Sequence, residues 1–119
     1  MISFKKVIRS FRHAFSGAVR VAKEEQNFRI ELLAAAVVIF LMFALDMSIV
    51  ERAILGLVIV LVLILELVNS VFERVADMLK PRFHQYVEEI KDIMAATVLV
   101  SAVGSVIIGL LIFWPHLVK

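Results

Sequence analysis

Residues 93–114 read IMAATVLVSAVGSVIIGLLIFW, a run of twenty-two residues without a charge. The hydrocarbon core of a bilayer requires roughly 20 apolar residues in an α-helix, so this run is long enough to span a membrane by itself. Two shorter uncharged runs precede it, at 32–45 and 53–65, and each must include flanking residues to cross. The sequence therefore predicts three transmembrane helices, at about 28–47, 53–68 and 93–114.

The composition of the whole chain supports a membrane protein. Of the 119 residues, 62% are apolar and 20% are charged, and the mean hydropathy is +0.98, whereas soluble domains are roughly 45–50% apolar. A soluble bundle with three buried helices is the alternative, but a soluble domain of this size buries only about two-thirds of its unfolded surface. We therefore predict a single-domain, all-α membrane protein over residues 1–119. The absence of cysteine excludes disulfides, thiolate metal sites and cysteine nucleophiles.

The first 25 residues predict an amphipathic helix that lies on the membrane surface. Large apolar residues such as Phe4, Phe11 and Phe15 recur at helical spacing, and Lys and Arg fill the other faces. A helix with this pattern lies in the plane of the interface with its apolar face in the headgroup boundary. Seven of the thirteen Lys and Arg residues fall within the first 29 positions, which favours an anionic membrane surface as the partner of this segment.

The basic residues also predict the orientation of the chain. Seven Lys and Arg precede the first uncharged run, one lies between the first two runs, four lie between the second and third, and Lys119 follows the third. Because basic connections stay in the cytoplasm, we expect the amino terminus inside and the carboxyl terminus outside. Residues 69–92 are then a cytoplasmic helix extension and loop, in which Pro81 should break the helix that continues from the second span.

An acidic stripe begins at the cytoplasmic end of the second span. Asn69, Glu73 and Asp77 follow Glu66 at offsets that place all four side chains within about 80° of one another on a helix. A charge exposed to lipid costs roughly 2.5–3.5 kcal/mol at the membrane centre, so the stripe should face protein or water. The alternative is a solvated helix end with chance alignment, and that reading fits Asp77 better than it fits Glu66.

A second acidic group, Glu24, Glu25 and Glu31, falls where the surface helix meets the first span. Two carboxylates from different helices with an amide nearby suit a hard divalent cation that takes its remaining ligands from water and phosphate oxygens. Lys91 and Asp92 begin the third span at the same membrane level, where a lysine can meet a polyphosphate. A snorkelling interfacial lysine is the common alternative for such a position. The Walker A and protein-kinase motifs are absent from the sequence.

These residues resemble the small bacterial integral-membrane lipid kinases, diacylglycerol kinase and its close relative undecaprenol kinase. The resemblance rests on residues 66–77 (ELVNSVFERVAD), on residues 91–96 (KDIMAA) and on residues 25–31 (EQNFRIE), and it extends over nearly the whole chain. It implies a homotrimer of three-span protomers in the bacterial cytoplasmic (inner) membrane, with active sites shared between neighbouring subunits. The implied reaction is transfer of the γ-phosphoryl group of ATP, with Mg²⁺ as cofactor, to the hydroxyl of a membrane lipid.

The resemblance also implies a role for particular residues. Glu66 resembles the catalytic base of the family, Asn69 the amide that positions the substrate and the nucleotide, and Glu25 and Glu73 the metal-binding carboxylates. The nucleotide contacts implied in the same way are Arg9, Arg12, His13, Asp77, His84, Lys91 and Asp92. His13 and Glu88 differ from the tyrosine and glycine that some members carry near the adenine. The expected partners are ATP, a lipid acceptor (diacylglycerol or undecaprenol) and further copies of the chain, with no nucleic acid.

A non-enzymatic membrane transporter or assembly subunit is the competing hypothesis. Such a protein would use Glu66 as a proton or cation site, which explains an ionisable residue within a span. It leaves unexplained the second acidic group, Asn69 and the Lys91–Asp92 pair.

Overall fold

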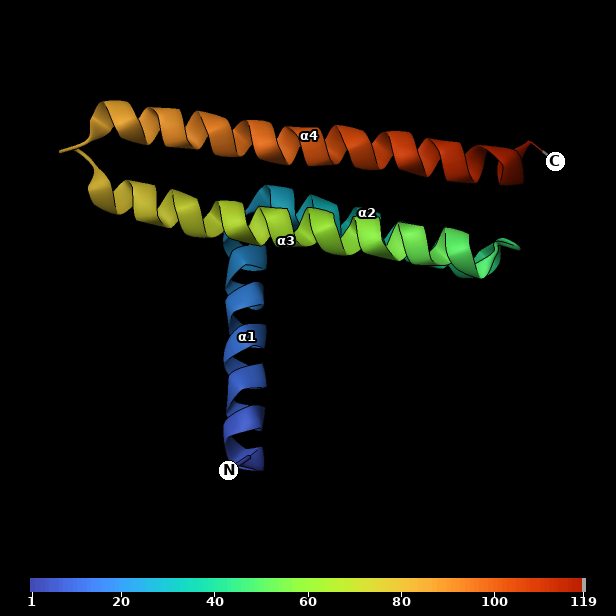
Figure 1. Ribbon diagram of the computed structural model, residues 1–119, viewed down its shortest axis with the longest axis horizontal. Coiled ribbons are helices and arrows are strands. Elements are labelled where there is room, and N and C mark those ends of the chain that lie inside the picture. The colour runs from blue at the N-terminus through green and yellow to red at the C-terminus, as the bar shows by residue number, and fades with distance from the viewer. Residues whose placement is uncertain (119) are drawn as a thin grey trace.

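The computed structural model describes residues 1–118, which form four α-helices: α1 (Phe4–Glu24), α2 (Gln26–Ala44), α3 (Ile49–Leu79) and α4 (His84–Leu117). Lys119 lies outside the described residues. Helices α2, α3 and α4 run alongside one another, whereas α1 points away from them (Figure 1). Helices α2, α3 and α4 are each long and apolar enough to cross a membrane. The prediction of an all-α membrane protein with three such helices is confirmed.

Helices α3 and α4 are longer than the hydrocarbon core of a membrane is thick. At 1.5 Å per residue, the 19 residues of α2 span about 28 Å, close to the roughly 30 Å of a hydrocarbon core. The 31 residues of α3 and the 34 of α4 span about 46 and 51 Å. Both helices therefore continue beyond a bilayer, and their extensions meet at residues 80–83. Helix α3 ends at Leu79, two residues before Pro81, because proline cannot supply the next backbone donor.

The first turn of α3 joins all three long helices. Ser48 and Glu51 form a capping box, in which the Ser48 hydroxyl accepts from Glu51 N at 3.1 Å and the Glu51 carboxylate accepts from Ser48 N at 3.0 Å. This pair satisfies two of the free N–H groups at the helix start. Next to it, Arg52 Nε donates to Met42 O of α2 at 3.0 Å, and Glu51 Oε2 lies 2.9 Å from His116 Nε2 of α4.

Few side chains are buried between the helices of the single chain. Helix α3 packs against both α2 and α4, and Met42, Met47 and Leu55 form a buried cluster near the start of α3. Most other large apolar side chains are exposed, for example Phe40 at 70% and Leu111 at 71%. Exposed apolar surface on this scale is not compatible with a soluble monomer. The soluble-bundle alternative is therefore wrong, and the chain is a multi-pass membrane protein.

Candidate active site

The buried polar residues of the described chain lie together on α3. Glu66 is 1% exposed, Asn69 8% and Ser70 1%, and the three fall where the apolar part of the helix ends. Glu73, one turn further, is exposed. Residues three and four apart share one helix face, so this face passes from protein to solvent as the helix leaves the apolar region. The predicted acidic stripe thus begins inside the protein at Glu66.

One oxygen of the Glu66 carboxylate is left without a partner by the residues that the structure describes. Its Oε2 atom is buried and has no hydrogen-bond partner among the described residues. Ser70 donates to Glu25 and Asn69 donates to Glu73, and both donors lie within about one turn of Glu66, so three acidic side chains from two regions of the sequence lie near one another. An unsatisfied buried polar group costs about 1–3 kcal/mol and points to a missing partner. A hydroxyl proton or a cation would each supply that partner.

Glu25 is held at the joint between α1 and α2. It is the one residue between the two helices, and its backbone is extended with φ −118° and ψ 119°. Arg29 fixes this joint, because its Nη1 atom donates to the last-turn carbonyls of Ala22 and Lys23, each at 2.9 Å. Carbonyls at a helix end otherwise lack an intrahelical donor. With the joint fixed, the Glu25 carboxylate reaches α3 and accepts a hydrogen bond from the Ser70 hydroxyl.

Arg74 completes a network across the same joint. Its Nη1 atom donates to Ser70 O at 3.2 Å and lies 3.7 Å from Glu25 Oε2, and its Nη2 atom pairs with Glu24. We call Glu24, Glu25, Ser70 and Arg74 the junction network. Sequence reasoning identified the two glutamates but not Ser70 or Arg74. The only local signal was their separation of four residues, which places both on one helix face.

The two carboxylates predicted to bind metal, Glu25 and Glu73, have different partners. Glu73 Oε1 accepts from Asn69 Nδ2 at 3.4 Å, whereas Glu25 belongs to the junction network. Within residues 1–118, no three His, Cys, Asp or Glu side chains are arranged as a ready-made metal site. Two carboxylates beside the unsatisfied Glu66 oxygen nevertheless fit a hard divalent cation that takes only part of its oxygen ligands from the protein.

Asp77 and Lys91 meet beyond the apolar parts of α3 and α4. Lys91 Nζ donates to Asp77 Oδ1 at 2.7 Å. This hydrogen bond holds the pKa of Asp77 below its ordinary value and raises the pKa of Lys91. A second pair, Lys80 with Glu88 at 3.6 Å, joins the same two extensions. The structure therefore brings the end of the acidic stripe together with the lysine that begins the third span.

Other predicted site residues lie apart from this cluster. Arg9, Arg12 and His13 are exposed on α1, the helix that points away from the other three (Figure 1). His84 and Asp92 are exposed on α4. None of these five side chains has a hydrogen bond or ion pair with the cluster among the described residues.

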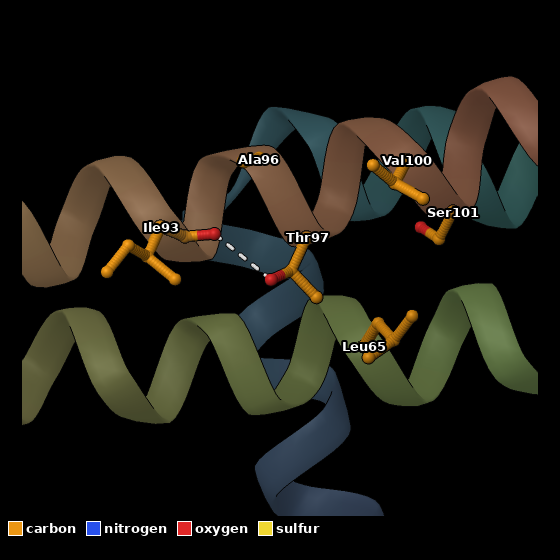
Figure 2. A pocket seen from close by; sticks show the side chains of 6 residues that line it. All are labelled: Leu65, Ile93, Ala96, Thr97, Val100 and Ser101. Carbon is orange, nitrogen blue, oxygen red and sulfur yellow. Dashed lines mark hydrogen bonds between the residues drawn. The ribbon is translucent and has the colours of Figure 1, made fainter.

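A hollow of about 480 Å³ lies between α3 and α4 at the depth of Glu66. Its lining residues are Leu65, Ile93, Ala96, Thr97, Val100 and Ser101 (Figure 2). The Thr97 hydroxyl donates to Ile93 O at 3.0 Å, so it is already satisfied within its helix. The Ser101 hydroxyl is satisfied in the same way, by Val98 O at 2.7 Å. The other four lining residues are apolar, and such a surface favours hydrocarbon over a polar ligand.

Comparison with known proteins identifies the family. The family model described as prokaryotic diacylglycerol kinase matches residues 12–113. The chain is 38% identical over 112 residues to an undecaprenol kinase of Bacillus subtilis, covering 94% of this chain and 91% of that protein. It is 34% identical over 111 residues to a diacylglycerol kinase of Synechocystis, covering 92% of this chain and 63% of that protein. It is 27% identical over 113 residues to a diacylglycerol kinase of Escherichia coli, covering 95% of this chain and 93% of that protein.

A non-enzymatic transporter or assembly subunit does not account for these similarities, because the relatives are kinases across nearly the whole length of the chain. The family model covers all three long helices up to residue 113, together with the α1–α2 joint. The chain belongs to the prokaryotic diacylglycerol kinase family, and it is a lipid kinase.

Proposed function

We propose that the protein transfers the γ-phosphoryl group of ATP to the hydroxyl of a membrane lipid, with Glu66 as the base. The observation that carries this proposal is the Glu66 carboxylate, which is 1% exposed and has one oxygen without a partner. It lies where the apolar part of α3 ends, at the depth that a lipid hydroxyl reaches. Membership of a lipid kinase family supports the reaction class.

In the reaction, Glu66 accepts the hydroxyl proton as the lipid oxygen forms its bond to the γ-phosphorus. The bond between that phosphorus and the β–γ bridging oxygen breaks, and ADP leaves with the electron pair. Phosphoryl transfer depends on positioning and charge neutralisation more than on covalent catalysis. Asn69 contributes positioning, because it is buried beside Glu66 and donates to Glu73.

Glu25 and Glu73 would hold Mg²⁺. Bound there, the ion would neutralise charge on the phosphate oxygens. Support comes from the hydrogen bonds that hold the two carboxylates on α3: the Ser70 hydroxyl donates to Glu25 and Asn69 donates to Glu73.

The nucleotide is contacted by Asp77, His84, Lys91 and Asp92 from the extensions of α3 and α4, and by Arg9, Arg12 and His13 from α1. Lys91 is 31% exposed on its side chain, so it remains accessible to phosphate. The α1 residues lie away from Glu66 within one chain. A homotrimer with shared sites provides a means for a neighbouring protomer to supply such contacts.

The proposed setting is the bacterial cytoplasmic membrane. The amphipathic segment 1–25, which contains α1, lies on the cytoplasmic surface, and spans at 28–47, 53–68 and 93–114 place the carboxyl terminus outside. Residues 69–92 then form the cytoplasmic extension and loop. The junction network and the Asp77–Lys91 pair both fall on the cytoplasmic side of this topology.

The acceptor is undecaprenol or diacylglycerol. The higher identity to the undecaprenol kinase favours undecaprenol. The test is to supply purified protein in mixed micelles with ATP, Mg²⁺ and each lipid in parallel, and to measure the phosphorylated lipid formed. We expect product with at least one acceptor and a higher kcat/KM for undecaprenol. No ATP-dependent product with either lipid would contradict the proposed function.

A further inference from the structure

The Glu25 carboxylate already has a positively charged partner. Arg74 Nη1 lies 3.7 Å from Glu25 Oε2, and the same oxygen accepts the hydrogen bond from Ser70. The Glu25 side chain is 19% exposed, whereas that of Arg74 is 46% exposed. A carboxylate assigned to a divalent cation therefore already has a cationic partner, and that partner is about half exposed to solvent.

Arg74 also has a second acceptor within reach. Its Nη2 atom pairs with Glu24, whose side chain is 54% exposed. The guanidinium group carries several donors in one plane and can hold two carboxylates at once. If the Arg74 guanidinium group moves away from Glu25, it can keep its ion pair with Glu24.

A cation that neutralises Glu25 also relieves the repulsion among the neighbouring carboxylates. Glu25 and Glu73 are hydrogen-bonded to Ser70 and Asn69, within about one turn of the buried Glu66, and negative charges clustered in this way repel one another when no counterion is present. Arg74 supplies one positive charge to this group when no metal is bound. A divalent cation would supply two, at the same carboxylate.

We propose that Arg74 is an exchangeable counterion of Glu25: it neutralises the carboxylate when no divalent cation is bound, and it remains on Glu24 when the cation takes its place. Arg74 is thus a positioning residue that acts through Glu25. The inference rests on the proposed function, because it takes Glu25 to be a metal ligand. It predicts that Arg74 and the cation compete, so that cation affinity without nucleotide is held low.

The test uses Mn²⁺ as the probe and binding, not turnover, as the readout. The full chain, purified in detergent micelles without nucleotide, is titrated with Mn²⁺, and the free ion is measured by electron paramagnetic resonance. Arg74→Gln should lower the Kd for Mn²⁺ by about tenfold, because a unit charge close to the ion is removed. The difference should shrink in about 1 M salt, where charges are screened within a few ångströms.

Two further variants isolate the effect. Arg74→Lys keeps the charge and should keep a Kd near that of the wild type. Arg82→Gln removes the same charge from the turn after α3, where Arg82 lies over the Phe83 ring, and should leave the Kd unchanged. Thermal unfolding followed by circular dichroism shows whether each variant is folded. If Arg74→Gln is folded and binds Mn²⁺ no more tightly than the wild type or Arg82→Gln, the competition does not exist.

A Glu25→Gln arm separates this inference from the proposed function. Weaker Mn²⁺ binding in Glu25→Gln, together with tighter binding in Arg74→Gln, supports both. Weaker binding in Glu25→Gln with no change in Arg74→Gln overturns the counterion role alone. An unchanged Kd in Glu25→Gln overturns the metal assignment and, with it, the counterion role.

Discussion

Lys91 donates a hydrogen bond from Nζ to Oδ1 of Asp77 at 2.7 Å, and this contact joins the extension of α4 to that of α3. The two residues stand on either side of the turn at residues 80–83. Their side chains are 31% and 62% exposed, and exposed ion pairs add little stability. The pair matters more for where it holds the Lys91 ammonium group, which we assign to the nucleotide.

Replacing Asp77 by Asn should therefore affect nucleotide binding more than folding. The amide cannot hold the ammonium group as a charged partner, so we expect the KM for ATP to rise several-fold with a much smaller change in kcat. Steady-state kinetics with ATP as the varied substrate measures this. Glu89→Gln, an exposed glutamate on α4, is the matched control and should leave both constants unchanged. A lower kcat at an unchanged KM would contradict the assignment.

The pH dependence of this pair follows from its two pKa shifts. The pKa of Asp77 is lowered in the folded protein. Its contribution to folding stability is therefore present above the unfolded pKa of about 3.9, and it is lost as pH falls through the folded pKa. The pKa of Lys91 is raised in the folded protein. Its contribution to folding stability is therefore present below the unfolded pKa of about 10.4, and it is lost as pH rises through the folded pKa. The Tm difference between wild type and Asp77→Asn should then be the same at about pH 6 and about pH 8. A difference that changes between these two pH values would show that another group controls the pair.

Glu25→Gln and Glu73→Gln should each raise the Mg²⁺ concentration needed for half-maximal activity. Loss of even an outer-shell partner costs a metal site roughly tenfold or more in affinity, and losing a ligand should cost at least as much. If both carboxylates hold one ion, the double variant should be little worse than the worse single variant. Fully additive losses, measured by Mg²⁺ titration of the initial rate, would indicate separate roles.

Helix α1 should act both as an anchor and as part of the site. Replacing Arg9 and Arg12 by Gln should impair activity more than assembly, because we assign these charges to the phosphates of the nucleotide. Phe11→Asp should instead loosen the helix from the membrane, because an exposed aromatic side chain expected to insert into the interface becomes a charge. Limited proteolysis in bilayers separates the two effects: new cleavage between residues 5 and 20 is expected only for Phe11→Asp. Equal protection in all variants with unchanged activity would make α1 a passive segment.

The existence of the helices was predictable because it depends on local sequence. Runs of apolar residues long enough to cross a bilayer leave the chain few other structures, since all backbone groups in lipid must be satisfied internally. The periodicity at residues 66–77 likewise predicted one helix face with Glu66, Asn69 and Glu73. One local signal was overlooked: Ser48 and Glu51 stand in the spacing of a capping box, and they begin α3.

The contacts between distant residues were not predictable in the same way. Arg74 pairs with Glu24 across 50 positions, and nothing in the sequence around either residue selects that partner. The sequence also does not predict that α3 packs between α2 and α4, because this arrangement depends on how three similar apolar helix surfaces fit together. A family resemblance indicates the roles of single residues. The contacts of the junction network depend instead on how α3 packs against the α1–α2 joint at Glu25.

The most direct test of the central claim is the rate of γ-phosphoryl transfer by Glu66→Gln. The amide keeps the volume of the side chain but cannot accept the hydroxyl proton, and removal of a general base typically costs on the order of 10²–10⁴ in rate. Purified wild type, Glu66→Gln and the control Glu89→Gln are supplied with γ-labelled ATP, Mg²⁺ and the preferred lipid, and labelled lipid is counted over time. We predict a kcat for Glu66→Gln lower by that factor, with an unchanged Tm and an unchanged Glu89→Gln rate. A kcat for Glu66→Gln close to that of the wild type would contradict Glu66 as the base.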